Sequence, residues 1–591
     1  MKLKRILAII VVLVLAMILA ACGRDAATPA EDEADAPPTV EDTTDQAEAD
    51  DPVVDDTPVE VGDREAYTFR FHQSYTWANP AEWGSDVVTA YWRDMFNIDI
   101  EWSTPDAIAD EVLNLMIIAG DLPCAIWMDR SPMNMDMARQ GLFVPIAEMD
   151  AMVPYNWYHE NIGRMTYDML AIDGVTYIIP NWARRGEAGG SSTGGNMAWM
   201  ITTNVHDAVG NPPLTTFEEL FEYAVMVRDA GLTNHAGASI IPMLQDGLGS
   251  QGVDFVNAIY RSFGGVVDGW WYGIQQDGTF GSNWDNPLWI EAVLEANRWV
   301  RYDLYPVTNL TDVGDQFLAN LNQGRGGLIW YDHSQDEGNS FRRILRADDP
   351  GNSIELITVQ DAGRTWLYPP ARGLPASRIN PEHHNSLGWN GTFITRQAER
   401  PERIFELMTW LLTPMGSIQA MYGPEGHLWE GLDANGFPQM LVPPATLTPM
   451  EIEELGLWNW MLAGHSDNVD TIKFAVNNAQ PEDYRSWVET IQYSLFTPNL
   501  RLTNEFVLLA LTIEPLEHLG IQRTLIHDHF LEMIPQILMA DSRDEAMTMI
   551  EGVRAFAEAQ GYDQIMARYR ERYEYNLALQ GGSIFDPPPM P

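Results

Sequence analysis

From Tyr67 onward, strand-like and helix-like segments alternate along the chain, and this alternation limits the folds that it can adopt. Apolar residues fall at every second position, or in short unbroken runs, in three expected strands: YTFRFHQ, IDIEWST and AIWM. Two segments between them place apolar residues at helical spacing: SDVVTAYWRDMFN and DAIADEVLNLMIIAG, which ends at Gly120. This order predicts an α/β fold in which helices cover a mostly parallel sheet.

Similar signals continue toward the C-terminal end of the chain. Further strands are expected in DGVTYIIP, MAWMITTN, RGGLIWYD, SIELITV and GTFITR. The expected helices are LTTFEELFEYAVMVRDAG, 287–303, 314–323 and a helical half from PERIFELMTWLLT to DEAMTMIEGVRAFAEAQG. A chain of 591 residues is long enough for more than one domain, and it shows no repeat of solenoid period.

The first 22 residues are typical of an export signal. A basic start, MKLKR, is followed by the apolar run 6–20 and then by Ala21 and Cys22. The tetrad LAAC, followed by Gly23, resembles the bacterial lipobox, in which the cysteine receives diacylglycerol and becomes the mature N-terminus. We therefore expect a lipoprotein signal peptide at 1–21 and lipidation of Cys22. The alternatives are an incidental cysteine and a permanent membrane span, which the absence of a basic flank disfavours.

Residues 24–65 have a composition unlike that of the rest of the chain. They are rich in Asp, Glu, Ala, Thr and Pro and contain no aromatic residue. Such a segment buries too little apolar surface to offset its ordering entropy, and its like charges extend it. We expect 22–65 to be a disordered tether behind the lipid anchor, with an acidic binding tail as the alternative, and 581–591 to be a terminal tail.

The charge of the chain also excludes some partners. A net charge of −49 argues against nucleic acid and anionic lipid head groups. Attachment to the extracytoplasmic face of the cell membrane must then come from acyl chains rather than from a basic patch. Cys124 is the only other cysteine, so lipidation of Cys22 leaves no pair for an intrachain disulfide.

Five segments spread over the body carry a resemblance to a known family: LNLMIIAGDLPCAIWMDR, MARQGLFVPIAEM, DGVTYIIP, WMITTNVHDAVGNPPLTTFEEL and ERPERIFELMTWLLTPMGSIQAMYGPEGHLWE. In order and spacing they resemble the family 1 extracellular solute-binding proteins of ABC importers, lipoprotein branch. Cys124 stands where that family usually has the second Asp of its A-G-D-x-P-D pattern.

The resemblance implies a two-lobed, periplasmic-binding-protein-like fold, type II-like, with the ligand cleft between two α/β lobes. Closure of such lobes around a ligand is a known switching mode. We expect the first lobe to comprise 66–182 and a returning segment at about 328–386. The second lobe is expected to comprise about 183–327 and 387–580.

The segment IWMDRS supplies the first candidate ligand contacts. It is similar to a run in maltose-binding protein, where an aromatic residue, an Asp and an Arg reach sugar hydroxyls. By this resemblance Trp127 would stack on a sugar ring, while Asp129 and Arg130 would hydrogen-bond to it. Hydroxyls both donate and accept, so a carboxylate and a guanidinium suit them. The structural alternative is a buried strand-end tryptophan beside a surface ion pair.

More aromatic residues lie where loops are expected to leave strands. Each of them alone is more often a core residue than a ligand contact, but together they are typical of a carbohydrate-binding cleft. These further candidates are Trp77, Trp182, Trp270, Trp271, Tyr272, Trp330, Tyr331, Trp389 and Asn390.

The sequence shows no motif that calls for a cofactor or a metal. It contains no G-x-x-x-x-G-K-[ST] loop, no G-x-S-x-G elbow and no H-E-x-x-H helix. The close histidine groups at His383–His384 and His527–His529 lack companions at metal-site spacing. We expect a monomeric, non-catalytic protein that delivers an oligosaccharide to an ABC permease. An exported glycoside hydrolase and a ligand-sensing ectodomain are the alternatives.

Overall fold

The structure is a computed structural model, and it describes most of the chain from residue 64 to residue 580. The signal peptide 1–21, Cys22, nearly all of the tether and the tail 581–591 lie outside the described residues. The described ranges are 64–75, 80–105, 109–185, 198–245, 252–267, 271–275, 277–310, 315–331, 336–361, 363–376, 382–384, 386–496, 500–514 and 517–580.

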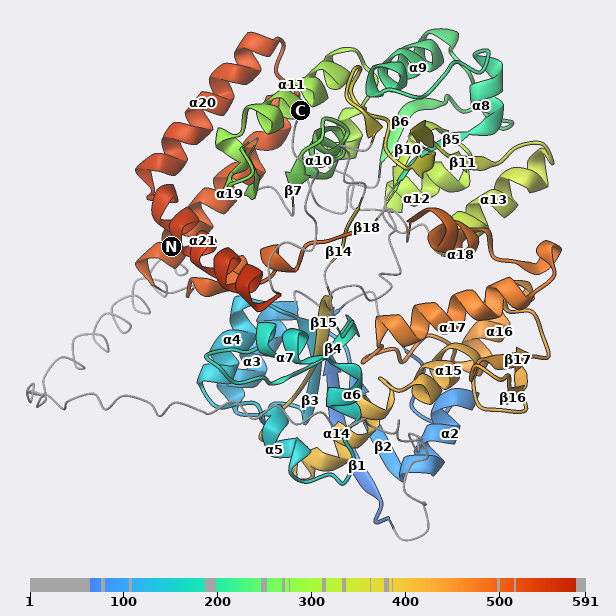
Figure 1. Ribbon diagram of the computed structural model, residues 1–591, viewed down its shortest axis with the longest axis vertical. Helices are drawn as coiled ribbons and strands as arrows, with labels where there is room; N and C mark the ends of the chain where they lie inside the picture. Colours follow the sequence, from blue (N-terminus) through green and yellow to red (C-terminus); the bar gives the residue numbers. More distant parts are fainter. Residues whose placement is uncertain are drawn as a thin grey trace, which may run out of the picture. The chain divides into compact units, whose positions relative to one another are not determined.

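The first lobe is built on a five-stranded sheet (Figure 1). Its strand order is β2 (Ile98–Ser103), β1 (Tyr67–Gln73), β3 (Ala125–Asp129), β15 (Leu387–Ile394) and β4 (Ile178–Ala183). β1 pairs in parallel with β2 and β3, as the alternation of elements predicts, whereas β15 runs antiparallel to both β3 and β4. The sheet is therefore mixed rather than mostly parallel, because its fourth strand arrives from far along the chain.

Ten helices of the described chain pack around this sheet and its connections. The early ones are α2 (Val87–Phe96), α3 (Ala109–Ala119), α4 (Pro132–Arg139), α5 (Ile146–Asp150), α6 (Trp157–Asn161) and α7 (Arg164–Met169). The later ones are α14 (Pro401–Trp410), α15 (Pro414–Tyr422), α16 (Pro449–Leu455) and α17 (Ser466–Ala479), with the hairpin β16 (Trp429–Leu432) and β17 (Pro438–Met440). Buried side chains from both groups share one apolar core with the sheet, which unites these distant segments in one lobe.

The second lobe is built on a four-stranded sheet. Its order is β11 (Ile354–Leu356), β5 (Ala198–Thr202), β10 (Gly326–Tyr331) and β6 (Ile241–Gln245). The helices α8 (Thr203–Ala208), α9 (Phe217–Ala230), α10 (Val253–Ser262), α11 (Pro287–Arg301), α12 (Asp315–Asn322) and α13 (Asp336–Asp348) belong to it. A capping box begins α9, since Thr216 Oγ1 accepts from the Glu219 amide and the Glu219 side chain accepts from the Thr216 amide.

The C-terminal helices complete the second lobe. They are α19 (His518–Leu538), α20 (Arg543–Ala559) and α21 (Tyr562–Leu579). α19 and α20 lie beside α11 (Figure 1), and all three helices contribute to the same apolar core as α11. Asn297 on α11 secures them, because its Nδ2 donates to the carbonyl groups of Ile537, Leu538 and Ala540. These helices arise from the helical half that the sequence predicts.

Short elements lie between and around the two lobes. The remaining strands are β7 (Val266–Val267), β8 (Tyr272–Ile274), β9 (Phe280–Ser282), β12 (Val359–Asp361), β13 (Arg364–Trp366), β14 (Glu382–His384) and β18 (Leu500–Leu502). The helix α18 (Trp487–Ile491), the π-helix Gln492–Phe496 that follows it and several short 3-10 helices complete the described elements. The chain passes from one lobe to the other between β4 and β5, between β13 and β15, and after α17.

Strand pairing assigns the two returning segments differently from the lobe division expected from the sequence. β15, which begins at Leu387, joins the first sheet, and β10 and β11 join the second. β10 and β11, in the first half of segment 328–386, therefore pair with the second lobe, and the segment that starts at 387 pairs with the first. RGGLIWYD and GTFITR have similar apolar patterns, and such a pattern does not say which distant strand will be the partner.

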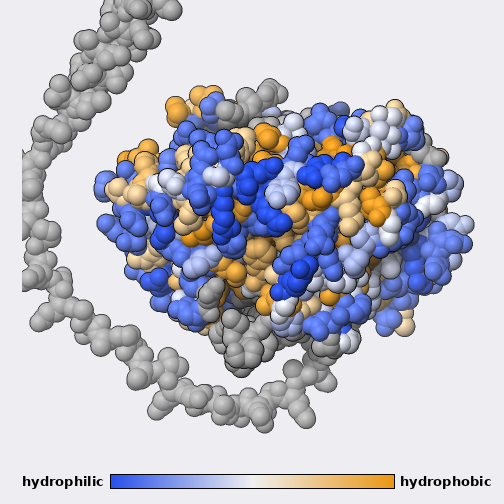
Figure 2. Space-filling model, turned by 90° about the horizontal axis from the view of Figure 1, so that it is seen from above, coloured by the Kyte–Doolittle hydropathy of each residue, from blue (hydrophilic) through white to orange (hydrophobic). Residues whose placement is uncertain are grey.

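The described residues show a mixed surface and no helix suited to cross a membrane. Figure 2 shows hydrophilic residues over much of one face, with hydrophobic residues between them, as is usual for a folded body in water. None of the described helices combines the length and the apolar character that crossing a bilayer requires.

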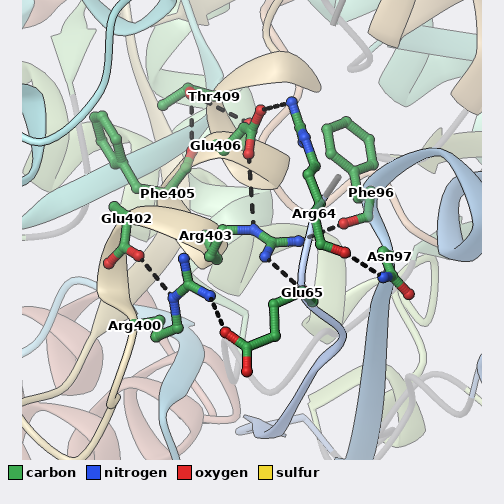
Figure 3. Close-up of polar contacts among 10 residues, drawn as sticks. All are labelled: Arg64, Glu65, Phe96, Asn97, Arg400, Glu402, Arg403, Phe405, Glu406 and Thr409. Carbon is green, nitrogen blue, oxygen red and sulfur yellow. Dashed lines mark hydrogen bonds and ion pairs between the residues drawn. The ribbon is translucent and has the colours of Figure 1, made fainter. Parts of the chain in front are cut away.

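An arginine and glutamate network holds the first described residues onto α14 (Figure 3). Arg64 pairs with Glu406 at 2.7 Å, and both side chains are nearly buried. Arg403 donates from Nη1 to the carbonyl of Glu65 at 2.9 Å, and from Nη2 to the carbonyl of Phe96. The chain thus enters the folded body through charge-assisted contacts at residues 64 and 65.

Candidate functional site

The candidate site is a cavity of about 450 Å³ in the first lobe, named here the aromatic pocket. This volume lies within the range of small-molecule sites, roughly 300–1,000 Å³. Five of its described lining residues are tryptophans, and none carries a charge. The described lining residues are Pro80, Trp102, Trp127, Asn181, Trp182, Trp389, Trp458, Asn459, Met461 and Leu462.

One edge of the five-stranded sheet supplies most of these side chains. Trp102 lies near the end of β2, Trp127 near the end of β3, and Asn181 and Trp182 near the end of β4. β15 is antiparallel to its neighbours, so its start, with Trp389, lies at the same edge. The register confirms this, because Asn390 pairs with both Asp129 and Asn181. Ligand sites of α/β sheets lie at such strand ends.

The loop between α16 and α17 forms another wall of the pocket. It carries Trp458, Asn459, Met461 and Leu462, and two hydrogen bonds join it to β4. The Trp182 amide donates to the Gly464 carbonyl at 2.7 Å, and the Gly464 amide donates to Asn181 Oδ1 at 2.8 Å. These two bonds fix the loop beside the strand that ends at the pocket.

Two pocket tryptophans have a left-handed backbone, with φ of 58° at Trp182 and 67° at Trp458. This conformation costs a residue with a large side chain roughly 1–3 kcal/mol, and such strain concentrates at functional sites. The hydrogen bond of the Trp182 amide to Gly464 and that of the Trp458 amide to the Ala420 carbonyl hold both backbones in place. These two strained backbones therefore lower the stability of the native state while they place the two indole rings at the pocket.

Tyr75 lies behind the pocket and orders its rings. Its ring meets Trp127 edge-on, with centroids 4.7 Å apart, and tilts against Trp389 at 5.5 Å. Trp127 and Trp389 are themselves 5.7 Å apart and nearly perpendicular. Edge-to-face contacts of this kind favour fixed ring orientations. Trp127 is buried, whereas Trp389 is 43% exposed, so Trp389 offers the larger accessible surface.

Polar contacts of Tyr75 link the pocket to Asp129 and Asn390. Tyr75 Oη donates to Asp129 Oδ1 at 2.8 Å and accepts from Asn390 Nδ2 at 2.9 Å. Burial raises the pKa of the Tyr75 hydroxyl well above its usual value, so the group stays protonated and can donate. Asp129 and Asn390 thus belong to the layer that supports the aromatic rings.

The structure places the other predicted contacts elsewhere. Arg130 donates to the carbonyl groups of Leu387 at 3.0 Å and Gly388, and its side chain lines a different cavity. Trp330 is 2% exposed in the second lobe, where its ring lies 5.1 Å from that of Trp199. A large apolar ring gains most by full burial, which explains this position.

Trp271 and Tyr272 also lie in the second lobe. Trp271 is buried against Phe530, with ring centroids 5.0 Å apart, and Tyr272 stacks on Phe506 at 6.1 Å. The structure therefore brings Trp127, Trp182 and Trp389 together at one pocket, and it does not bring Trp271, Tyr272 or Trp330 there. Trp77, Trp270 and the side chain of Tyr331 lie outside the described residues. The assignment of all these residues as ligand contacts stays a prediction.

Several residues of the pocket were missed by sequence reasoning. Trp102 was available as the aromatic residue near the end of an alternating strand, IDIEWS. Trp458 and Asn459 lie in GLWNWM, a tryptophan-rich loop between two helices, and Trp460 from the same loop packs edge-on against Trp102 at 4.4 Å. Two tryptophans in an irregular segment were the signal that could have indicated this wall.

The charged groups of the described chain do not form a metal site. No group of three or more His, Cys, Asp or Glu side chains in the described ranges is arranged to hold a metal ion. The aromatic pocket itself offers indole rings, amides and a thioether, which are groups that suit a neutral polar ligand with apolar faces.

Comparison with known proteins places the fold. No protein-family model and no curated protein sequence matches the chain. Among solved structures, it resembles the S. pneumoniae ABC-transporter substrate binding protein FusA in complex with kestose, with 16% identity and a TM-score of 0.59. That match covers 86% of this chain and 99% of FusA.

Two further structures show the same likeness. The alginate-binding protein AlgQ2, solved without calcium ion, is 13% identical, with a TM-score of 0.57 and coverage of 87% of this chain and 99% of AlgQ2. An HMO binding ABC-transporter associated solute binding protein from Bifidobacterium longum infantis is 13% identical, with a TM-score of 0.57 and coverage of 86% and 99%. The chain has the two-lobed fold of ABC-transporter substrate-binding proteins, so the predicted fold class is confirmed.

Proposed function

We propose that the protein is the solute-binding component of an ABC importer and captures an oligosaccharide in the aromatic pocket. The observation that carries this proposal is the pocket itself, where five tryptophans meet at one edge of the sheet in a substrate-binding fold. Indole faces cover the apolar C–H faces of sugar rings, while amide groups such as Asn181 and Asn459 match hydroxyls.

The uncharged lining favours a neutral sugar over an acidic one. An acidic sugar entering this pocket would lose hydration without meeting a guanidinium or ammonium among the described lining residues. A neutral sugar needs only stacking surfaces and hydrogen-bonding groups, and the pocket supplies both. The proposed ligand is therefore a neutral oligosaccharide.

The same lining argues against hydrolysis. Glycoside hydrolases place two carboxyl groups on either side of the scissile bond, roughly 5–9.5 Å apart. None of the described lining residues of the pocket is Asp or Glu. The structures that resemble the chain are those of binding proteins, which supports the proposal that this protein binds without catalysis.

The proposal extends to where the protein acts. The N-terminal sequence supports a signal peptide at 1–21 and lipidation of Cys22, so the body would be tethered at the extracytoplasmic face of the membrane. There, a monomer would present its loaded form to the ABC permease. Replacing Cys22 with Ala should release the protein from the membrane fraction, and a variant that stays with membranes would contradict lipid anchoring.

Calorimetric titration with sugars tests the binding function. We expect kestose or another neutral oligosaccharide to bind saturably, to change tryptophan fluorescence, and to be recovered at its original length by mass spectrometry. An alginate oligosaccharide of similar length serves as the acidic comparison, and preferential binding of it would contradict the neutral class. Recovery of shortened sugar would overturn the binding function in favour of the hydrolase.

A further inference from the structure

A second cavity, of about 230 Å³, lies at Arg130, directly after the end of β3, and is named here the arginine cavity. It opens between the first lobe and the C-terminal segment of the chain. The first lobe contributes Arg130, Arg139 and apolar residues such as Ile178, while the C-terminal segment contributes Leu508 and Arg572. Its volume corresponds to roughly eight water molecules, which suits a small ligand.

The described lining of this cavity has an excess of positive charge. It contains three arginines but only one acidic residue, Asp173. Asp173 is already paired, since its Oδ2 lies 2.9 Å from Nε of Arg139, which also approaches Glu514 at 3.2 Å. Arg130 and Arg572 form no ion pair with a carboxylate of the described chain. Arg572 lies over the ring of Tyr575, at 5.0 Å from its centroid, so two of the three arginines face the cavity without an ion pair among the described residues, in a protein whose net charge is −49.

Backbone carbonyls occupy only part of the donors on these two arginines. Arg130 donates from its two terminal nitrogens to Leu387 and Gly388, and Arg572 donates from Nη2 to the carbonyl of Met169 at 2.8 Å. The Nε–H groups of both are shielded from solvent and have no hydrogen-bond partner in the described chain. Burial lowers the pKa of Arg130 to about 10, although the nearby Asp129 carboxylate opposes this shift, and burial also lowers the pKa of Arg572.

The rest of the lining is largely apolar. Leu170, Ile178 and Phe393 are buried residues of the first lobe, and Leu508 and Leu511 face them from the C-terminal segment. A ligand that fills this space would gain from an apolar body as well as from a negative charge.

We propose that the arginine cavity binds a small organic carboxylate that carries an apolar group. Its carboxylate would neutralise Arg572 and Arg130, and its apolar group would lie against Phe393 and Leu508. Such a ligand would contact the first lobe and α21 together. This site is separate from the aromatic pocket, and its existence does not depend on the sugar-binding proposal.

Calorimetric titration of the whole protein with benzoate tests the proposal, with benzamide as the uncharged ligand of matched shape. We expect saturable benzoate binding, and at least about tenfold weaker binding of benzamide. Arg572→Gln should weaken benzoate at least about tenfold. Arg568→Gln is the matched control, because Arg568 lies one turn earlier on α21, is half exposed, and pairs with Glu571 at 3.3 Å.

Two more variants test whether benzoate binds in the arginine cavity rather than elsewhere. Ala171→Leu fills the cavity without changing any charge and should abolish benzoate binding even if Arg572→Gln does not fold. Trp389→Ala alters the aromatic pocket and should leave benzoate binding unchanged. Absence of saturable binding, equal affinity for benzamide, unchanged affinity in folded Arg572→Gln or Ala171→Leu, or loss of binding in Trp389→Ala would each overturn the proposal.

Discussion

The Tyr75 hydroxyl donates to the Asp129 carboxylate over 2.8 Å, which ties the segment after β1 to the end of β3 beside the aromatic pocket. The same hydroxyl accepts from Asn390 on β15, so one side chain joins three neighbouring strands of the first sheet. The ring of Tyr75 meanwhile holds Trp127 and Trp389 at fixed angles. Orientation of the pocket rings and cohesion of the sheet edge thus depend on the same residue.

Replacing Tyr75 with Phe should lower the free energy of unfolding by about 1–2 kcal/mol, because the buried Asn390 amide loses its acceptor. Sugar affinity should fall as well, since the pocket rings lose a fixed neighbour. Chemical denaturation and calorimetry would measure both effects. Tyr91→Phe is the control, because Tyr91 is 44% exposed and its ring makes no pocket contact. Equal stability of the two variants would contradict the role of the hydroxyl.

Two tryptophans predicted as ligand contacts should respond in opposite ways to truncation. Trp389 is 43% exposed at the pocket, so Trp389→Ala should weaken sugar binding by more than about 1 kcal/mol with little loss of stability. Trp330 is buried against Trp199 and Tyr368, so Trp330→Ala should lower the free energy of unfolding by about 3–5 kcal/mol. A stable Trp330→Ala variant with reduced affinity would place Trp330 at a ligand instead.

His465 should make the protein less stable as the medium becomes acidic. It caps α17, its Nδ1 accepts from the Asn468 amide at 3.3 Å, and it faces Arg184, Arg185 and Asp467. Burial, with a smaller contribution from the two arginines, lowers its pKa to about 3. The native ring therefore stays neutral between pH 6.5 and 3, while the unfolded ring takes up a proton.

Stability must then fall as pH drops through that interval, by up to about 1.4 kcal/mol per pH unit for this one group. Urea titrations from pH 6.5 to 4 would compare the wild type with His465→Gln, whose slope should be smaller by this amount. Identical slopes in the two proteins would show that the histidine is not held neutral in the native state.

Glu406 should contribute to stability through its contacts with Arg64 and Arg403 at the start of the folded body. Burial is the largest influence on its carboxyl group and raises its pKa, while Arg64 and Arg403 oppose that shift. Glu406→Gln leaves two nearly buried guanidinium groups without their carboxylate, which should cost about 3–5 kcal/mol. The peptide bond after Arg64 should also become accessible to trypsin.

Glu148→Gln provides the matched control for this change. Glu148 pairs with Arg396 at 2.7 Å, but both side chains are nearly half exposed. Water screens such a pair, so the variant should lose less than about 1 kcal/mol. Similar losses in Glu406→Gln and Glu148→Gln would indicate that the Arg64 contact does not secure the chain.

Local patterns predicted the elements well because they depend on neighbouring residues. YTFRFHQ forms β1 with the expected bounds, and the capping residues Thr216 and Gly231 enclose α9. Pairing between distant segments was harder to foresee. The apolar pattern of GTFITR (391–396) predicts a strand that overlaps β15, but its partners at 125–129 and 178–183 are selected by packing across the whole lobe.

The pocket was partly predictable for the same reason. Trp127, Trp182 and Trp389 lie in or next to segments that the sequence predicts to be strands, and this position was the signal that indicated them. Trp458 belongs to a loop whose position depends on Gly464 and Asn181, a contact between residues 283 positions apart. Arg130 follows the predicted strand directly, yet its side chain turns to the carbonyl groups of β15, because that strand lies beside β3.

The position of β15 in the middle of the first sheet also sets an order of events at the ribosome. Asp129 ends β3, and Leu387 begins β15, so 258 further residues (387 − 129) must be made before β3 and β4 acquire the strand between them. At synthesis rates of about 5–20 residues per second, this takes roughly 13–52 s. During that time β3 has an open edge that other nascent chains can join. Holding chaperones should therefore associate with the chain until residue 394 has emerged.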